Sequence, residues 1–325
     1  MLQAWGSFAL GLVLLALGGD SIVKGASGLA QKLGASPFVA GLLLIAFGTS
    51  LPELFVNAYA LAHGQPALAL GNAVGSNVAN FGLTLGVAAL AAPVLARMRL
   101  LSPLLVLLAV ATFALIAFGL DGEISRIEGV VLLLAFVALL TFLLARGRSE
   151  AAEVRESIAA YAGTRTVLWM NLLRVAIAAA LLYYGAKFAV SGAVALGAGW
   201  GWSPLLVGLL PVAIGTALPE VAGAIFAARR GQGDMLLGHV IGSSLFNLLL
   251  IVGGMAAIQP LGLPDLFVRF ALPGSLAFVL LLYPMLRGDL RIQRGEGAVL
   301  LAAFVGWVVF AVYVIDQAKD VIPLR

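Results

Sequence analysis

Long apolar stretches separated by short polar segments fill almost the whole chain of 325 residues. A helix needs about 20 apolar residues to cross the hydrocarbon core of a membrane. The pattern contains ten such stretches, and we expect one transmembrane helix from each: residues 5–24, 36–62, 67–92, 101–119, 125–145, 166–191, 203–229, 235–259, 265–287 and 296–316. Little sequence remains outside them, so the pattern predicts an all-α integral membrane protein without a soluble catalytic domain.

The composition agrees with this interpretation. Hydrophobic residues make up 62% of the chain and charged residues 10%, and the mean hydropathy is +1.09. Soluble domains carry about 25% charged residues. The chain has no cysteine, which excludes disulfides, thiolate metal sites and cysteine nucleophiles. Its net charge of +4 comes from basic residues scattered among short loops, so it does not indicate nucleic-acid binding.

Basic residues concentrate in the loops that follow the odd-numbered stretches. These loops hold 12 of the 19 Lys and Arg residues: Lys32, Arg97, Arg99, Arg146, Arg148, Arg155, Arg165, Arg229, Arg230, Arg287, Arg291 and Arg294. Cytoplasmic loops of membrane proteins carry an excess of Lys and Arg. We therefore expect these loops, including the one between helices 5 and 6, to be cytoplasmic and both termini to lie outside the cell membrane.

The second half of the chain repeats the first at an offset of 167 residues. Gly48-Thr49-Ser50-Leu51-Pro52-Glu53 returns as Gly215-Thr216-Ala217-Leu218-Pro219-Glu220. Because each half has five helices, an odd number, the second copy must enter the membrane from the opposite face. The sequence therefore predicts two inverted repeats, residues 1–145 and 166–325, joined by a solvated cytoplasmic linker at 146–165.

Polar residues and helix-breaking residues interrupt helices 2, 3, 7 and 8. Pro52 removes a backbone donor and frees carbonyl groups near Ala46 and Thr49. Freed backbone groups are tolerated at membrane depth only where they face protein or a polar cavity. The third stretch carries polar side chains spaced i, i+4, i+8 on one helical face: Asn72, Ser76 and Asn80. We expect these four helices to be broken around a polar site at the midplane.

Three of the 15 acidic residues lie within an apolar stretch away from a loop: Asp20, Glu53 and Glu220. Asp20 precedes Lys24 by four residues, and the two are expected to form an ion pair. Glu53 and Glu220 have no basic neighbour, although a carboxylate at the bilayer centre costs about 3 kcal/mol. They occupy equivalent repeat positions and should meet near the pseudo-two-fold axis, where their mutual repulsion requires a bound cation or a proton.

The available ligands are hard oxygen donors. They are Glu53, Glu220, Thr49, Ser50, Thr216, Ser76, Ser243, Asn80, Asn247 and the freed backbone carbonyls. Carboxylates with amide or carbonyl oxygens suit Ca²⁺, and hydroxyls with carbonyls suit Na⁺, whereas Mg²⁺ usually keeps several waters. His239 is expected to be a helix-end histidine with a local partner.

The two copies, GTSLPEL…GNAVGSNVAN and GTALPEV…GHVIGSSLFN, resemble the α-repeats of the cation/calcium exchanger superfamily. They look most like its prokaryotic sodium/calcium exchanger branch, and the resemblance covers essentially the whole chain. The proton-driven branch usually has asparagine in place of the threonine of this motif. Thr49 and Thr216 therefore favour sodium.

The resemblance implies four cation sites between helices 2, 3, 7 and 8. A central Ca²⁺ site would use Glu53, Glu220 and the carbonyls of Thr49 and Thr216. The implied inner Na⁺ site comprises the Ala46 carbonyl, Thr49, Ser50, Glu220 and Ser243. The implied outer Na⁺ site comprises the Ala213 carbonyl, Thr216, Glu53 and Ser76. Asn80 and Asn247 would border the centre, and helices 1 and 6 would slide past the other helices.

Two residues depart from the expected pattern. Ala217 stands where the repeat partner has Ser50, so the outer Na⁺ site lacks one hydroxyl and should be the weaker of the two. Asn247 stands where some relatives carry aspartate, so only two central carboxylates remain.

The sequence therefore predicts an antiporter that exchanges Na⁺ for Ca²⁺ by alternating access, without a cofactor and without enzymatic activity. Its substrates would bind at the midplane of the cell membrane. An antiporter on the same scaffold that couples H⁺ to Ca²⁺ or another divalent cation is the main alternative. A channel would need a continuous polar pore, which helices 4, 5, 9 and 10 do not offer. An intramembrane hydrolase could use paired acids, but the hydroxyl and amide surroundings favour cation ligation. The sequence does not define an oligomeric state.

Overall fold

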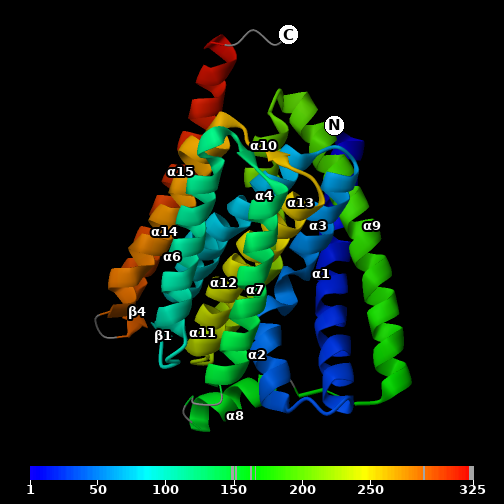
Figure 1. Ribbon diagram of the computed structural model, residues 1–325, viewed down its shortest axis with the longest axis vertical. Coiled ribbons are helices and arrows are strands. Elements are labelled where there is room, and N and C mark those ends of the chain that lie inside the picture. The colour runs from blue at the N-terminus through cyan, green and yellow to red at the C-terminus, as the bar shows by residue number, and fades with distance from the viewer. Residues whose placement is uncertain (148–149, 151, 162, 165, 288–289, 322–325) are drawn as a thin grey trace.

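The protein is a bundle of long helices (Figure 1) in a computed structural model that describes residues 1–147, 150, 152–161, 163–164, 166–287 and 290–321. The helices of the first half are α1 Leu2–Lys32, α2 Pro37–Phe47, η1 Gly48–Ser50, α3 Leu51–Ala62, α4 Pro66–Ala79, η2 Asn80–Thr84, α5 Leu85–Ala91, α6 Leu101–Phe118, η3 Gly119–Asp121 and α7 Arg126–Arg146. Those that follow are α8 Ala152–Tyr161, α9 Leu168–Trp200, α10 Pro204–Val207, η5 Gly208–Val212, α11 Ala213–Arg229, α12 Gly233–Leu245, η6 Phe246–Val252, α13 Gly253–Ile258, η7 Phe267–Ala271, α14 Leu272–Arg287 and α15 Arg294–Val321.

The number of membrane spans agrees with the sequence pattern. Among the described residues, nine helices are long and apolar enough to cross a membrane, and a bent pair, Phe38–Ile45 and Gly48–Ala62, makes a tenth. The start of α1 and the end of α15 lie at one end of the bundle, and α8 lies at the other (Figure 1). The prediction of an all-α, multi-pass membrane protein is confirmed.

Each of the four helices predicted to be broken contains a segment that is not α-helical. The first is interrupted by the 3₁₀ segment η1, where its two parts bend by 45°, and Pro52 stands in the first turn of α3. The other three continue through the π-helical segments η2, η5 and η6 as single spans. Pro219, the counterpart of Pro52, lies inside α11, so the two repeats distort the backbone at different places.

Both copies of the Ser-Pro motif begin a helix as the sequence predicts. The side chain of Ser36 accepts a hydrogen bond from the Val39 backbone N–H at 3.2 Å, and Pro37 is the first residue of α2. Ser203 caps α10 in the same way, through the N–H of Leu206 at 3.3 Å. Proline fits the first helical position because its missing N–H would have no partner there.

Two short antiparallel ladders connect the halves of the chain. β1 Val94–Leu95 pairs with β4 Arg291–Ile292, and β2 Glu123–Ile124 pairs with β3 Leu261–Gly262. The helix α6 runs between β1 and β2, so the two ladders lie at opposite ends of the bundle. Each ladder thus pairs a strand of the first repeat with a strand of the second, and one ladder lies at each end of the bundle. This arrangement is what inverted repeats require.

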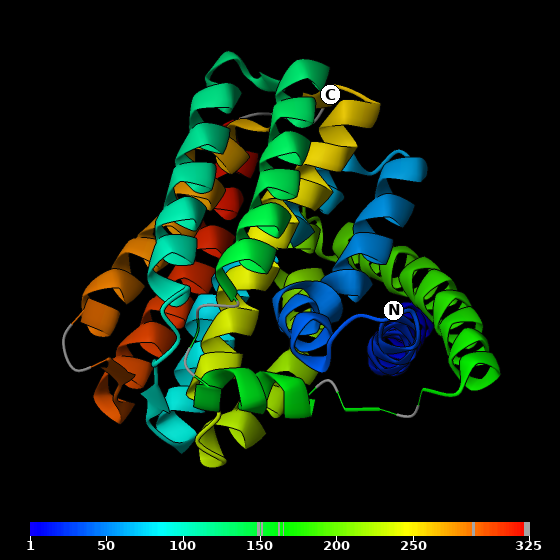
Figure 2. The ribbon, with the colours of Figure 1, turned by 60° about the horizontal axis from the view of Figure 1, so that its bottom comes forward.

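The helices α1 and α9 form a closely packed pair at one edge of the bundle (Figure 2). A Cβ atom at Gly185 would lie 2.9 Å from the Leu15 backbone nitrogen, and one at Gly192 would lie 2.8 Å from Phe8 Cα. Ser7 Oγ also donates a hydrogen bond to the Phe188 carbonyl at 3.0 Å. Small residues allow such close backbone contact between membrane helices.

Most side chains in the described part of the linker are exposed, among them Glu153 and Glu156, but some of its residues pack on the bundle. The buried carboxylate of Glu150 accepts hydrogen bonds at the start of α6, including one from the Leu100 N–H at 2.9 Å. In α8, Ile158 is buried, and Arg155 lies 5.3 Å from the centre of the Phe38 ring of α2. The apolar positions of α8 recur at helical spacing, which gives the helix a face that packs on the bundle.

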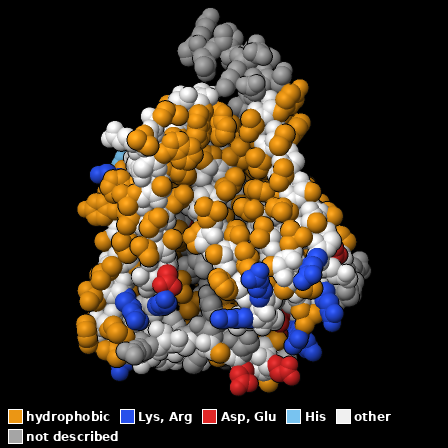
Figure 3. Space-filling view, turned by 180° about the vertical axis from the view of Figure 1, so that it is seen from behind, with side chains coloured by type: hydrophobic (Ala, Val, Ile, Leu, Met, Phe, Trp, Pro, Cys, Tyr) orange, Lys and Arg blue, Asp and Glu red, His pale blue; other side chains and the backbone are white. Residues whose placement is uncertain are grey.

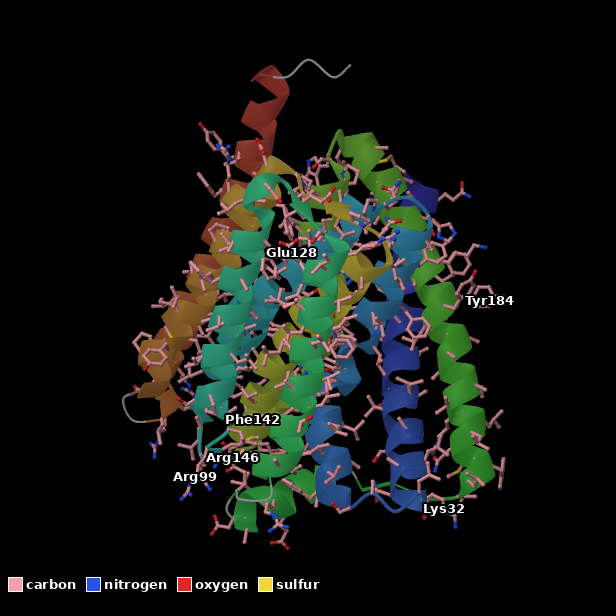
Figure 4. The ribbon with its side chains drawn as sticks, viewed as in Figure 1. Lys32, Arg99, Glu128, Phe142, Arg146 and Tyr184 are labelled. Carbon is pink, nitrogen blue, oxygen red and sulfur yellow. The ribbon has the colours of Figure 1, made fainter. Side chains whose placement is uncertain are left out.

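Charged side chains are distributed unevenly between the two ends. The rear surface is largely apolar, and Lys and Arg gather in its lower part (Figure 3). Lys32, Arg99 and Arg146 lie at the end that carries α8, whereas Glu128 lies near the opposite end (Figure 4). The basic residues thus gather at one end of the bundle, in agreement with their concentration in the loops that follow the odd-numbered stretches.

Candidate cation-binding site

Two carboxylates, one from each repeat, lie close enough to interact electrostatically. Glu53 lies in the first turn of α3 and is 4% exposed, and Glu220 lies in α11. The Oε2 atom of each carboxylate is buried without a hydrogen-bond partner among the described residues. A buried carboxylate oxygen without a partner is costly, so this arrangement favours a bound cation or a proton.

The residues implied for the inner Na⁺ site come together across the repeat boundary. Ser50 Oγ and Ser243 Oγ form a short hydrogen bond. Thr49 and Glu220 line the same cavity. The remaining member of the set, the backbone carbonyl of Ala46, lies in the last turn of α2, just before η1.

Three of the residues implied for the outer Na⁺ site are neighbours, namely Ala213, Thr216 and Glu53. Thr216 Oγ1 donates a hydrogen bond to the Ala213 carbonyl at 3.2 Å, and the Thr216 side chain contacts the Glu53 carboxylate. Ser76 is buried, and its hydroxyl donates to Asn72 Oδ1 at 3.5 Å. Ala217 is buried beside this set and contributes no side-chain oxygen.

The amide side chains orient each other around the centre. Asn80 Nδ2 donates to Ser243 Oγ at 3.4 Å. Asn247 Nδ2 donates to Asn77 Oδ1 at 3.0 Å, which leaves Asn247 Oδ1 buried without a partner among the described residues. Since the amide nitrogen is occupied, the free oxygen of Asn247 is available as a neutral ligand or as an acceptor for water.

Four polar residues of this network are not among the predicted ligands, although Asn72 belongs to the predicted polar stripe: Asn57, Asn72, Asn77 and His239. Asn77 Nδ2 donates to the carbonyl of Ser244, its own counterpart 167 residues later, at 3.3 Å. Asn72 Nδ2 donates to Asn57 Oδ1 at 3.1 Å. Asn57 follows Glu53 by four residues, so a polar residue one helical turn from the carboxylate was the available sequence signal.

The prediction of a local partner for His239 is wrong. Its Nδ1 atom lies 2.8 Å from Oγ1 of Thr49, a residue 190 positions away, and its Nε2 atom is buried. The histidine lies in the interior because α12 packs against α2 and η1.

A cavity of about 640 Å³ connects this region to one end of the molecule. Its inner wall includes Thr49, Thr216 and Glu220, and its rim includes the exposed residues Asp20 and Arg230. Ala160 of α8 also lines it, so the cavity reaches the end that carries the linker helix. The predicted ion pair is present, with Lys24 Nζ 2.6 Å from Asp20 Oδ2.

Inverted helical repeats around a central set of oxygen donors define the class of secondary transporters. The profile of the family described as sodium/calcium exchanger protein matches residues 3–145 and 170–313. The chain belongs to this family.

Similar proteins cover nearly the whole chain. Sodium/calcium exchanger MaX1 of Methanosarcina acetivorans is 30% identical, with 94% of this chain and 97% of that protein covered. The Ca²⁺/H⁺ antiporter ChaA of Bacillus subtilis is 26% identical, with 83% of this chain and 82% of that protein covered. A structure of the sodium-calcium exchanger NCX_Mj, soaked with Na⁺ and Sr²⁺, superposes with a TM-score of 0.66 at 30% identity, covering 95% of this chain and 98% of that chain.

Proposed function

We propose that the protein is an antiporter that exchanges Na⁺ for Ca²⁺ and is not an enzyme. The observation that carries this proposal is the pair of carboxylates Glu53, which is buried, and Glu220, which is half-buried, each with a buried oxygen that has no partner among the described residues. Two carboxylates with neutral oxygens suit Ca²⁺, and hydroxyl and carbonyl oxygens suit Na⁺. The ions are the cargo, and no cofactor is required.

Mutual exclusion would couple the two ions. The proposed Ca²⁺ site and both proposed Na⁺ sites draw on Glu53 or Glu220, so Ca²⁺ and Na⁺ compete for the same carboxylates. Occupation by either ion satisfies the negative charges, whereas the empty site leaves them in repulsion. The site would therefore change sides of the membrane mainly when loaded, as exchange requires.

The proposed topology puts both termini outside the cell and α8 in the cytoplasm. It rests on the concentration of Lys and Arg at the α8 end of the bundle. In this orientation the cavity that reaches Glu220 opens toward the cytoplasm. The close packing of α1 with α9 supports the expectation that these two helices move together in alternating access.

Coupling to Na⁺ is tested with purified protein in liposomes. We expect uptake of ⁴⁵Ca²⁺ into Na⁺-loaded vesicles when the external solution lacks Na⁺, and little uptake once the Na⁺ gradient is removed. Uptake that ignores Na⁺ and follows an imposed pH gradient would instead support the H⁺/Ca²⁺ antiport of the relative ChaA. Empty liposomes and liposomes with Glu53→Gln protein control for leakage.

The missing hydroxyl at Ala217 gives a second test. Replacing Ala217 by Ser is expected to lower the Na⁺ concentration that gives half-maximal exchange by about threefold, because one oxygen ligand is added. The measurement is ⁴⁵Ca²⁺ flux as a function of Na⁺ concentration. Ala58→Ser, at an exposed position of α3, serves as the matched control. An unchanged Na⁺ dependence would show that Ala217 does not weaken the outer site.

A further inference from the structure

Two side-chain contacts join α12 to the 3₁₀ segment η1 that follows α2: Ser243 bonds to Ser50, and the His239 imidazole lies against the Thr49 hydroxyl. The distance from Nδ1 to Oγ1 is 2.8 Å. The Nε2 atom of the ring is buried without a partner within the described part of the chain, and the ring also lies close to the Ile45 backbone carbonyl of α2. The ring also lines the cavity beside Thr49 and Glu220. Nδ1 thus contacts the hydroxyl of a proposed ligand from the opposite repeat.

The equivalent residues of the other repeat are arranged differently. Asn72 occupies the position that corresponds to His239, and it bonds to Asn57 and Ser76 of its own half. Thr216 corresponds to Thr49, and its hydroxyl donates to a carbonyl of its own helix, that of Ala213. The threonine in η1 is therefore contacted by an imidazole from the other half, whereas its counterpart bonds to its own backbone and contacts a carboxylate from the other half.

A threonine hydroxyl has one hydrogen to donate and two lone pairs to offer a cation. A neutral imidazole with its hydrogen on Nε2 has an acceptor lone pair on Nδ1. When Nδ1 accepts the Thr49 hydrogen, both oxygen lone pairs are directed away from the ring and are free for a ligand. The hydrogen bond also fixes the Thr49 rotamer at a segment where the helix is irregular.

We propose that His239 is a positioning residue for Na⁺: its Nδ1 accepts the Thr49 hydroxyl hydrogen and orients that oxygen toward the inner Na⁺ site. This inference rests on the proposed function. In the proposed site, Ca²⁺ uses the Thr49 backbone carbonyl and Na⁺ uses its hydroxyl. Loss of His239 therefore weakens Na⁺ binding and leaves Ca²⁺ binding nearly unchanged.

Direct ion binding to purified protein tests this role. The measurements are the ⁴⁵Ca²⁺ dissociation constant and the Na⁺ concentration that displaces half of the bound ⁴⁵Ca²⁺. For His239→Leu we expect the half-displacing Na⁺ concentration to rise about 3- to 10-fold, the range for one lost hydrogen bond, with the Ca²⁺ constant within about twofold of the parent. His239→Asn, whose Oδ1 can replace Nδ1 as acceptor, should restore most of the Na⁺ affinity.

A double-mutant cycle separates positioning from a general structural role. In a Thr49→Val protein, adding His239→Leu should change the half-displacing Na⁺ concentration by less than about twofold, because the hydroxyl that His239 orients is already absent. Additive effects, or equal losses of Na⁺ and Ca²⁺ affinity, would overturn the proposal. His63→Leu is the matched control, because His63 stacks on Tyr59 at an exposed turn and is the other histidine of the chain.

Two further comparisons keep the test decisive. If His239→Leu is not stable in detergent, His239→Gln replaces it, since its amide matches the position of Nε2 and does not reach Thr49. The His239→Gln protein should then show the same selective loss of Na⁺ affinity as expected for His239→Leu. If Na⁺ fails to displace ⁴⁵Ca²⁺ from the unmodified protein, the proposed function itself is wrong. If Na⁺ displaces it equally from parent and variant, only the role of His239 is refuted.

Discussion

Replacing Glu53 or Glu220 by Gln is expected to reduce Na⁺-dependent ⁴⁵Ca²⁺ uptake by at least about 100-fold, because the number of charged ligands largely determines Ca²⁺ affinity. The amide keeps the size of the side chain and one oxygen but removes the charge. In each variant the remaining carboxylate would face a divalent cation alone. Either substitution should have this effect, since the buried Oε2 atoms of both residues lack another partner among the described residues.

The measurement is initial uptake into Na⁺-loaded proteoliposomes at several Ca²⁺ concentrations. Glu123→Gln is the matched control, because Glu123 is an exposed acidic residue on β2, away from the site. The control should transport at the parent rate. Parent rates in Glu53→Gln or Glu220→Gln would mean that Ca²⁺ binds elsewhere.

Replacing Gly71 by Val is expected to disrupt the bundle and to abolish transport. A Cβ atom at Gly71 would lie 2.9 Å from the Leu209 backbone nitrogen and 3.1 Å from Gly208 Cα, where α4 crosses η5. The neighbours are backbone atoms, so the helices must separate. Overpacking of this kind costs about 1–3 kcal/mol or more, which corresponds to a fall in melting temperature of about 2–5 °C or more.

Thermal unfolding in detergent and ⁴⁵Ca²⁺ uptake together check this prediction. Gly306→Val is the control, because no atom lies within 4 Å of a Cβ atom at that position of α15. The crossing at Gly71 also positions Asn72 and Ser76 of the same helix, so transport should fail along with stability. A Gly71→Val protein with the parent melting temperature would show that this crossing is looser than the structure indicates.

The helices and most of the site could be predicted because their signals are local. The apolar stretches predict the helices that contact lipid. The motifs Ser36-Pro37 and Ser203-Pro204 predict where two helices begin. The candidate ligands could be identified because a carboxylate is costly in a membrane wherever the chain folds. The repeat at an offset of 167 residues then identified the equivalent candidate ligand in the other half of the chain.

Contacts between distant parts of the chain could not be predicted. The partner of His239 depends on how α12 packs against η1, and the Asn77–Asn247 bond joins the two repeats. The two ladders have strands of two residues each, too short to show an alternating pattern. The docking of α8 depends on a surface of α2 that forms only when the bundle assembles.

The ladder between β1 and β4 also constrains how the protein folds. It joins residues roughly 200 positions apart. The backbone groups of β1 can therefore pair only after the loop between α14 and α15, which contains β4, has been synthesised. Contacts between such distant residues form late because the intervening chain must first be brought together. Until then β1 is an open strand edge at the membrane surface, which can pair with another chain. Assembly of the first repeat is therefore completed only after nearly the whole protein has been synthesised and inserted.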